Sequence, residues 1–156
     1  MPALISSVSK NVDRVFDALE DIVRRCPDEL WARKQGGYIF WQQIYHLLVN
    51  IGTYALGQTV PSPLYPEAVQ FLKEDAPDTL SKDRLLAFMG DTRKALDAYL
   101  AALPDDELSK RHEARSKRMG RDVTVLEAFF QMSGHFYYHI GASDAMLRDM
   151  GVKGAM

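Results

Sequence analysis

Two histidines four residues apart, His135 and His139, are the residues whose type and spacing most directly suggest chemistry. They lie in the largely apolar run "GHFYYHIGASDAML", which has the character of a helix. Residues i and i+4 of a helix lie on one face, about 6 Å apart along the axis, so both imidazoles can aim at one point. A metal ion takes such nitrogens as ligands, but a pair of this spacing also arises by chance between hydrogen-bonded core residues.

A third histidine, His46, lies in the middle of "WQQIYHLLVN", among both polar and apolar neighbours. If its helix packs beside the helix of His135 and His139, the three imidazoles form one set. Three histidines leave open coordination positions for water or substrate, as catalytic metal sites require. The zinc metalloprotease motif is a poor match, because Phe136 stands where those helices carry a glutamate.

Apolar residues at helical spacing predict four long helices and no convincing strand. The expected helices cover residues 5–26, 38–57, 79–103 and 124–150. Residues 58–80 contain four prolines and a short helical piece at 66–73, so this stretch is expected to cross over the bundle. Residues 104–124 form a polar connector in which His112 is expected to face solvent. The sequence therefore predicts one domain over residues 1–156, an all-α four-helix bundle with a long crossover between its second and third helices.

Composition and charge restrict the partners that this chain is expected to have. The chain has 156 residues, of which 47% are hydrophobic, which is enough for a core. Its formal net charge of -2 gives no positive field that would attract nucleic acid or an anionic membrane. The single cysteine, Cys26, excludes an intramolecular disulfide. Neither a secretory signal nor an apolar run of about 20 residues is visible, so we expect a cytoplasmic protein with no nucleic-acid or membrane partner.

These elements together resemble the DinB-like superfamily of metal-binding four-helix bundles, which includes the YfiT-type proteins and thiol-dependent S-transferases. "IYHLLVNIGTY" resembles the first ligand element of that family, and "GHFYYHIGASDAMLRDMG" resembles the second. The resemblance implies that His46, His135 and His139 are ligands of a divalent metal ion, nickel or zinc foremost. It further implies a homodimer that acts as a hydrolase or thiol S-transferase on a small-molecule substrate, with a low-molecular-weight thiol as a candidate co-substrate.

Catalytic acids and bases cannot be assigned from the sequence, because no Asp or Glu falls beside the three histidines on their helical faces. Polar side chains are better placed to hydrogen-bond the imidazoles or to contact substrate. The candidates are Gln42, Gln43, Asn50, Gln131 and Ser143, with Tyr138 as a pocket-lining aromatic residue. An exposed surface position is the alternative for each amide.

Two further patterns each allow two interpretations. The segment "KRHEARSKRMGR" is expected to be a solvated connector, with the binding of an anionic substrate or cofactor as the alternative. Gly134 and Gly141 on the last expected helix, with the aromatic residues Trp31, Tyr38, Phe40 and Trp41, favour a dimer interface over packing within one bundle.

Three hypotheses for function remain open at this point. The first is a metal-dependent enzyme, and the second is a non-catalytic stress-response protein that binds metal or a small ligand. The third is a metal-free bundle whose histidines belong to the core.

Overall fold

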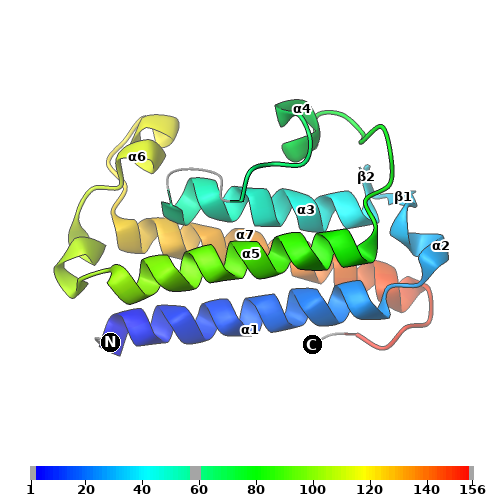
Figure 1. The fold of residues 1–156 in the computed structure, drawn as a ribbon, viewed down its shortest axis with the longest axis horizontal. Helices are drawn as coiled ribbons and strands as arrows, with labels where there is room; N and C mark the ends of the chain where they lie inside the picture. Colours follow the sequence, from blue (N-terminus) through cyan, green and yellow to red (C-terminus); the bar gives the residue numbers. More distant parts are fainter. Residues whose placement is uncertain (1–2, 57–60, 155–156) are drawn as a thin grey trace.

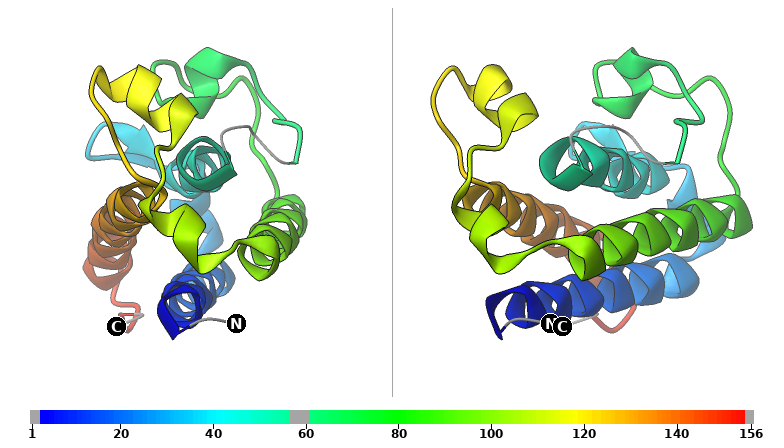
Figure 2. Two further views of the ribbon diagram at one scale, coloured as in Figure 1. Left: turned by 90° about the vertical axis from the view of Figure 1, so that its left-hand side faces the viewer. Right: turned by 60° about the vertical axis from the view of Figure 1, so that its left-hand side comes forward.

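Four long helices form the body of the protein in a computed structural model that describes residues 3–56 and 61–154. They are α1 (Ala3–Arg25), α3 (Phe40–Ile51), α5 (Lys82–Ala102) and α7 (Val125–Asp149). Figure 1 shows them packed lengthwise, and the end-on view of Figure 2 shows them around one core. The prediction of an all-α four-helix bundle is therefore confirmed.

The helix α3 continues without a break into a π-helical turn, η1 (Gly52–Leu56). The expected end of this helix near Gly57 lies outside the described residues. α3 packs against α5 and α7, and α1 also packs against α5 and α7. Each of the four long helices thus contacts at least two of the others, which makes α3 and α7 neighbours as the three-histidine hypothesis requires.

Two short helices lie on the outer side of α3 (Figures 1 and 2). One is α4 (Glu67–Gln70), in the crossover between α3 and α5, and the other is α6 (Glu113–Met119), in the connector before α7. A 3₁₀ turn, η2 (Asp105–Ser109), precedes α6. Because these segments cover α3, all twelve of its residues are buried, including its polar ones.

Side chains of α3 hold the crossover against the bundle. The Gln42 amide nitrogen donates to the carbonyl oxygens of Val69, at 3.0 Å, and Glu74, at 2.7 Å. The Tyr45 hydroxyl accepts from the backbone N–H groups of Leu64, at 2.8 Å, and Tyr65, at 3.3 Å. The described part of the crossover, residues 61–80, is therefore held against α3 by hydrogen bonds, and it can supply groups to a site.

A short hairpin between α1 and α3 was not expected. After α2 (Asp28–Trp31), strand β1 (Lys34–Gln35) pairs antiparallel with β2 (Tyr38–Ile39). Gly36 and Gly37 form the turn with φ of 62° and 94°, a left-handed backbone that favours glycine in two-residue hairpins. The expectation of no strand was wrong here, because the pair is too short to show a period of two in the sequence.

The connector before α7 also differs from the expectation. His112 is buried, and its Nδ1 accepts a hydrogen bond from the Arg115 N–H at 3.2 Å, so it caps the N-terminus of α6. The prediction that His112 faces solvent was wrong. α6 ends at Met119 and is followed by Gly120, whose φ of 66° is the left-handed conformation common after helix ends.

Aromatic residues proposed for a dimer interface are mostly used inside the bundle. Trp31, Phe40 and Trp41 are buried, and Trp31 Nε1 donates to the Leu80 carbonyl oxygen at 2.7 Å. Tyr38 is the exposed one, at 38%. Because Trp31, Phe40 and Trp41 are buried inside the bundle, they give no support to a dimer, contrary to the argument from composition.

None of the helices in the described part of the chain is long and apolar enough to cross a membrane.

Candidate metal centre

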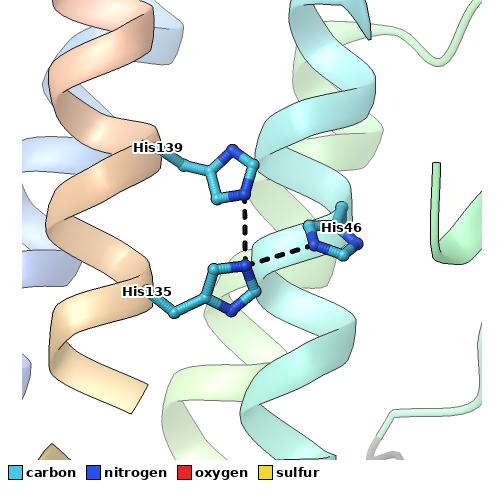
Figure 3. A group of neighbouring side chains, drawn as sticks. All are labelled: His46, His135 and His139. Carbon is cyan, nitrogen blue, oxygen red and sulfur yellow. Dashed lines mark hydrogen bonds between the residues drawn. The ribbon is translucent and has the colours of Figure 1, made fainter. Parts of the chain in front are cut away.

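His46 of α3 and His135 and His139 of α7 meet between the two helices, with their rings directed at one another (Figure 3). The Nε2 atoms of His46 and His135 are 3.3 Å apart, and those of His135 and His139 are 3.1 Å apart. One nitrogen from each of the three rings lies within 4.8 Å of the other two. His46 and His139 are buried, and His135 is half-buried. The structure thus brings together all three residues that the sequence singled out.

The periodicity of α7 explains how its two histidines reach this position. Met132, Phe136 and Ile140 recur at intervals of four and are buried in the core, which fixes the rotation of the helix. His135 and His139 are also four positions apart, so both lie on the side of α7 that faces α3. Their ring centroids are 4.9 Å apart.

The protonation of His46 is set by the crossover. Its Nδ1 lies 2.7 Å from the carbonyl oxygen of Gln70, which can only accept a hydrogen bond. Nδ1 therefore carries the proton, and Nε2 presents its lone pair to the other two rings. A backbone carbonyl that fixes the ring in this way is the usual support of a metal-binding histidine. Asn50 donates to the His46 backbone carbonyl at 2.7 Å and its amide nitrogen also contacts the ring, which further restrains this side chain.

Hydrogen bonding alone does not account well for the cluster. If His135 Nε2 carries no proton, it faces the Nε2 lone pair of His46 at 3.3 Å without a donor between them. If His135 Nε2 carries a proton, His46 and His139 compete to accept that one proton. His139 then carries its own proton on Nδ1, which is buried and has no partner in the described structure. Either arrangement leaves a buried polar group poorly satisfied, which is costly.

A divalent metal ion would satisfy all three rings. With metal–nitrogen bonds of about 2.1 Å, adjacent ligand nitrogens are about 3.0 Å apart in octahedral and about 3.4 Å apart in tetrahedral coordination. The Nε2 separations of two of the three pairs, 3.1 and 3.3 Å, fall within this range, and the ligand nitrogens of all three rings lie within 4.8 Å of one another. Neutral imidazole nitrogen suits nickel, zinc and several other divalent ions. The donor set, and the spacing of two of its three pairs, therefore fit a metal ion.

Burial keeps the three imidazoles in the neutral form that binds metal. It lowers the pKa of His139 to about 3, with repulsion from His135 and His46 as the further causes. It lowers the pKa of His135 to about 4, with contributions from His46 and from the cations Arg115 and Arg118. The pKa of His46 is also lowered by burial, against the opposing effect of the Gln70 carbonyl.

A cavity of about 560 Å³ opens beside the histidines. His46 and His135 form part of its wall, so a molecule in the cavity can reach the cluster directly. The other lining residues come from α3, η1, the crossover and α6: they are Asn50, Tyr54, Glu67, Phe71, Lys73 and Arg118. The site therefore combines a candidate metal centre with space for a small ligand.

The polar residues suggested by the sequence have varied roles. Asn50 contacts His46 and lines the cavity, as expected. Gln42 binds the crossover backbone, and the structure records no hydrogen bond from it to the described imidazoles. Gln43 donates to the sulfur of Met146 at 3.5 Å, and Gln131 accepts from Arg115 Nε at 2.7 Å. The structure records no hydrogen bond from either amide to the described histidines.

Two more of these residues lie next to His139 on α7. Ser143 is buried one turn further along, and its Oγ has no hydrogen-bond partner in the described structure, like Nδ1 of His139. Tyr138 is 68% exposed, and its ring meets that of His139 edge to face at a centroid distance of 5.0 Å.

Three residues of the site, Glu67, Phe71 and Lys73, were missed by sequence analysis. They belong to the crossover, and nothing in their local spacing points to the histidines, because they reach the cavity only through the packing of the crossover over α3. Arg115 and Arg118 belong to the segment that was expected to be a solvated connector, with anion binding as the alternative, and Arg118 lines the cavity. Arg115 is in fact buried, so the expectation of a solvated connector was wrong at this position.

The comparison with protein families agrees with this geometry. The family model described as the DinB superfamily matches residues 11–143, which include the three histidines and most of the bundle. A comparison with curated proteins gave no match.

Proposed function

The chain belongs to the DinB superfamily, and we propose that it is a metal-dependent enzyme, a hydrolase or a thiol S-transferase acting on a small molecule. In this proposal His46, His135 and His139 hold one divalent ion, with nickel and zinc as the foremost candidates. The observation that carries it is the convergence of three neutral imidazole nitrogens at the wall of a cavity. Three protein ligands leave coordination positions open, which distinguishes catalytic from purely structural metal sites.

A divalent ion bound there would supply Lewis acidity toward a carbonyl oxygen or would stabilise the thiolate form of a thiol co-substrate. The protein's own groups would orient the histidines and accept a proton. The Gln70 carbonyl and Asn50 orient His46, and the apolar side of α7 orients His135 and His139. Glu67 is the carboxylate among the cavity-lining residues and is our candidate to accept a proton.

The alternative is a non-catalytic protein that binds a metal or a small ligand in a stress response. One observation favours it: the structure records no hydrogen bond between a carboxylate and any of the three imidazoles in the described part of the chain. Glu67 is exposed and lies in the cavity wall rather than against the cluster. A protein that only binds its ligand needs no group for proton transfer, so Glu67 is the residue on which the two functions differ.

Metal content tests the first part of the proposal. Elemental analysis of the protein after loading with nickel or zinc should give about one ion per chain, and His46→Ala, His135→Ala and His139→Ala should each lose it. His112→Asn is the matched control, since it removes a histidine outside the cluster and keeps a residue that can cap α6. Full retention of metal by His46→Ala would exclude α3 from the site.

Turnover tests the second part. The loaded protein should be assayed against a panel of thiol-conjugation reactions and against a panel of esters and amides. An enzyme should turn over at least one member, and Glu67→Gln should lower kcat by about a hundredfold if this carboxylate transfers a proton. Stoichiometric metal without turnover on either panel would favour the non-catalytic alternative.

A further inference from the structure

Two arginines of α6 lie beside the histidines, each stacked on an aromatic ring. The guanidinium of Arg115 lies 3.9 Å from the ring centroid of Tyr54, and that of Arg118 lies 5.3 Å from the ring centroid of Phe71. Residues three apart share one face of a helix, so both arginines point to the same side of α6. Tyr54, Phe71 and Arg118 itself line the cavity. Stacking holds a guanidinium in place while its N–H donors remain available for a ligand.

Neither arginine has a carboxylate partner in the described part of the chain. Arg115 is only 6% exposed, and the one recorded hydrogen bond of its side chain goes from Nε to the neutral amide oxygen of Gln131. Arg93, in contrast, forms ion pairs with Asp13 and Asp17. A buried cation without a counter-charge is unfavourable, so an anion that enters from the cavity would complete this arrangement.

The crossover adds a second cation to the cavity wall, beside Arg118. Lys73 lines the cavity and also forms no ion pair within the described residues. It follows Leu72, whose φ of 59° is a left-handed conformation that residues other than glycine adopt at a cost. This bend lets Phe71 and Lys73 on either side of it both reach the cavity. Glu67 is the single acidic residue against Lys73 and Arg118 in the lining, so the wall carries excess positive charge.

We propose that the cavity binds a small organic molecule that carries a carboxylate, with Arg118 as the main partner of that carboxylate. Lys73 and Arg115 supply further positive charge, and the opposite end of the molecule lies at His46 and His135. This assignment rests on the proposed function for the role of the histidines, whereas the carboxylate contact stands on α6 and the crossover alone. It names the substrate class that the family match leaves open.

Arg118 and His135 line the same cavity, so a carboxylate bound to Arg118 would lie in the cavity beside the histidine cluster. Arg118 rather than Arg115 is the residue to test, because Arg118 is exposed and lacks a recorded hydrogen bond, whereas Arg115 anchors α6 to Gln131 and Tyr54. Substitution of Arg118 should therefore leave the fold intact.

The experiment compares two probes that differ only in charge, 3-mercaptopropionate and its neutral amide, 3-mercaptopropionamide. Isothermal titration of the zinc-loaded full chain should show the acid binding about tenfold more tightly than the amide, as expected for one charge-assisted contact. Arg118→Gln should abolish this preference, Arg118→Lys should keep part of it, and Lys73→Gln should reduce it. Lys117→Gln is the matched control, because it removes the same charge from the neighbouring, exposed position of α6 outside the cavity lining.

Equal affinity of the two probes for the wild-type protein would overturn the proposal. A loss in Lys117→Gln as large as that in Arg118→Gln would also overturn it, since the effect would then be a general field and not a site. The titration is repeated on the metal-free protein to separate the two proposals. A preference for the acid that persists there and depends on Arg118 supports the carboxylate site even if no metal binds. Stoichiometric zinc without any preference would refute the carboxylate site alone.

Discussion

Acidification should destabilise the metal-free protein through the histidine cluster, and His139 allows the size of this effect to be worked out. Its pKa falls to about 3 in the folded protein, chiefly by burial, from an ordinary value of about 6.5. The unfolded chain therefore binds a proton at this residue between these pH values, while the folded protein does not. The contribution of neutral His139 to stability is complete above pH 6.5 and is lost as the pH falls toward 3.

The magnitude follows from the distance between the two pKa values. One pKa unit corresponds to about 1.4 kcal/mol, so at pH 4 the unfolded state gains about 3 kcal/mol from this one imidazole. Water in the neighbouring cavity screens part of the effect, and we take about 2 kcal/mol as the expected value. This is a large share of the stability of a typical domain, which is about 5–15 kcal/mol.

The assay is urea unfolding in the presence of EDTA at pH 7 and pH 4, followed by the fluorescence of the buried Trp31 and Trp41. His139→Gln removes the titrating group, so the variant should lose about 2 kcal/mol less than the wild-type protein between the two pH values. His112→Asn should retain the wild-type loss. Equal losses in the wild type and His139→Gln would refute the argument that burial of the cluster disfavours its protonation.

Three other outcomes are expected. Metal occupancy should fall on acidification only well below pH 6.5, because the pKa values of His135 and His139 are lowered to about 4 and 3; retention of metal at pH 3 would point to other ligands. Trp31→Phe should lower the free energy of unfolding by about 1–2 kcal/mol, since the Leu80 carbonyl loses its donor; an unchanged urea midpoint would contradict this. Light scattering should give twice the chain mass of 17.7 kDa, whereas a value near 17.7 kDa would exclude the expected homodimer.

The dimer expectation now rests on a narrower argument than the sequence suggested. Gly134 and Gly141 lie on the exposed side of α7, and a Cβ added at either position would meet nothing within 4 Å. Close packing inside the bundle therefore does not explain these glycines. Phe130 and Tyr138, at 67% and 68% exposure, lie on the same helix and are exposed as well. A second copy of the chain packed on this face of α7 is the arrangement that we propose.

The parts of the site that could be predicted are those governed by helical periodicity. The i, i+4 spacing alone places His135 and His139 on one face, and their apolar neighbours determine which face turns inward. His46 required the further assumption that its helix lies beside α7, which the resemblance to a family supported and the structure bears out. Local patterns and one assumption about packing were sufficient for the three histidines.

The remaining parts could not be predicted because they depend on contacts between segments far apart in the chain. Gln70 lies 24 residues from His46, and the crossover that brings its carbonyl to the ring has no helical period of its own. Arg115 and His112 belong to a charged segment that looks solvated, and they become buried only because α6 packs over η1. The amino-acid composition of this segment shows which residues are neighbours in the sequence, but not which segments pack against it in the fold.

The same packing explains why the histidines are suited to a metal. α3 would be a partly exposed helix in a bare four-helix bundle, and His46 and Asn50 would then meet water. The crossover and α6 bury its outer face, and this burial lowers the pKa of His46. The coverage stops at the cavity, where the histidines meet a wall containing Lys73, Glu67 and Arg118. Two segments that lie outside the four-helix bundle thus cover the histidines and also form part of the cavity wall beside them.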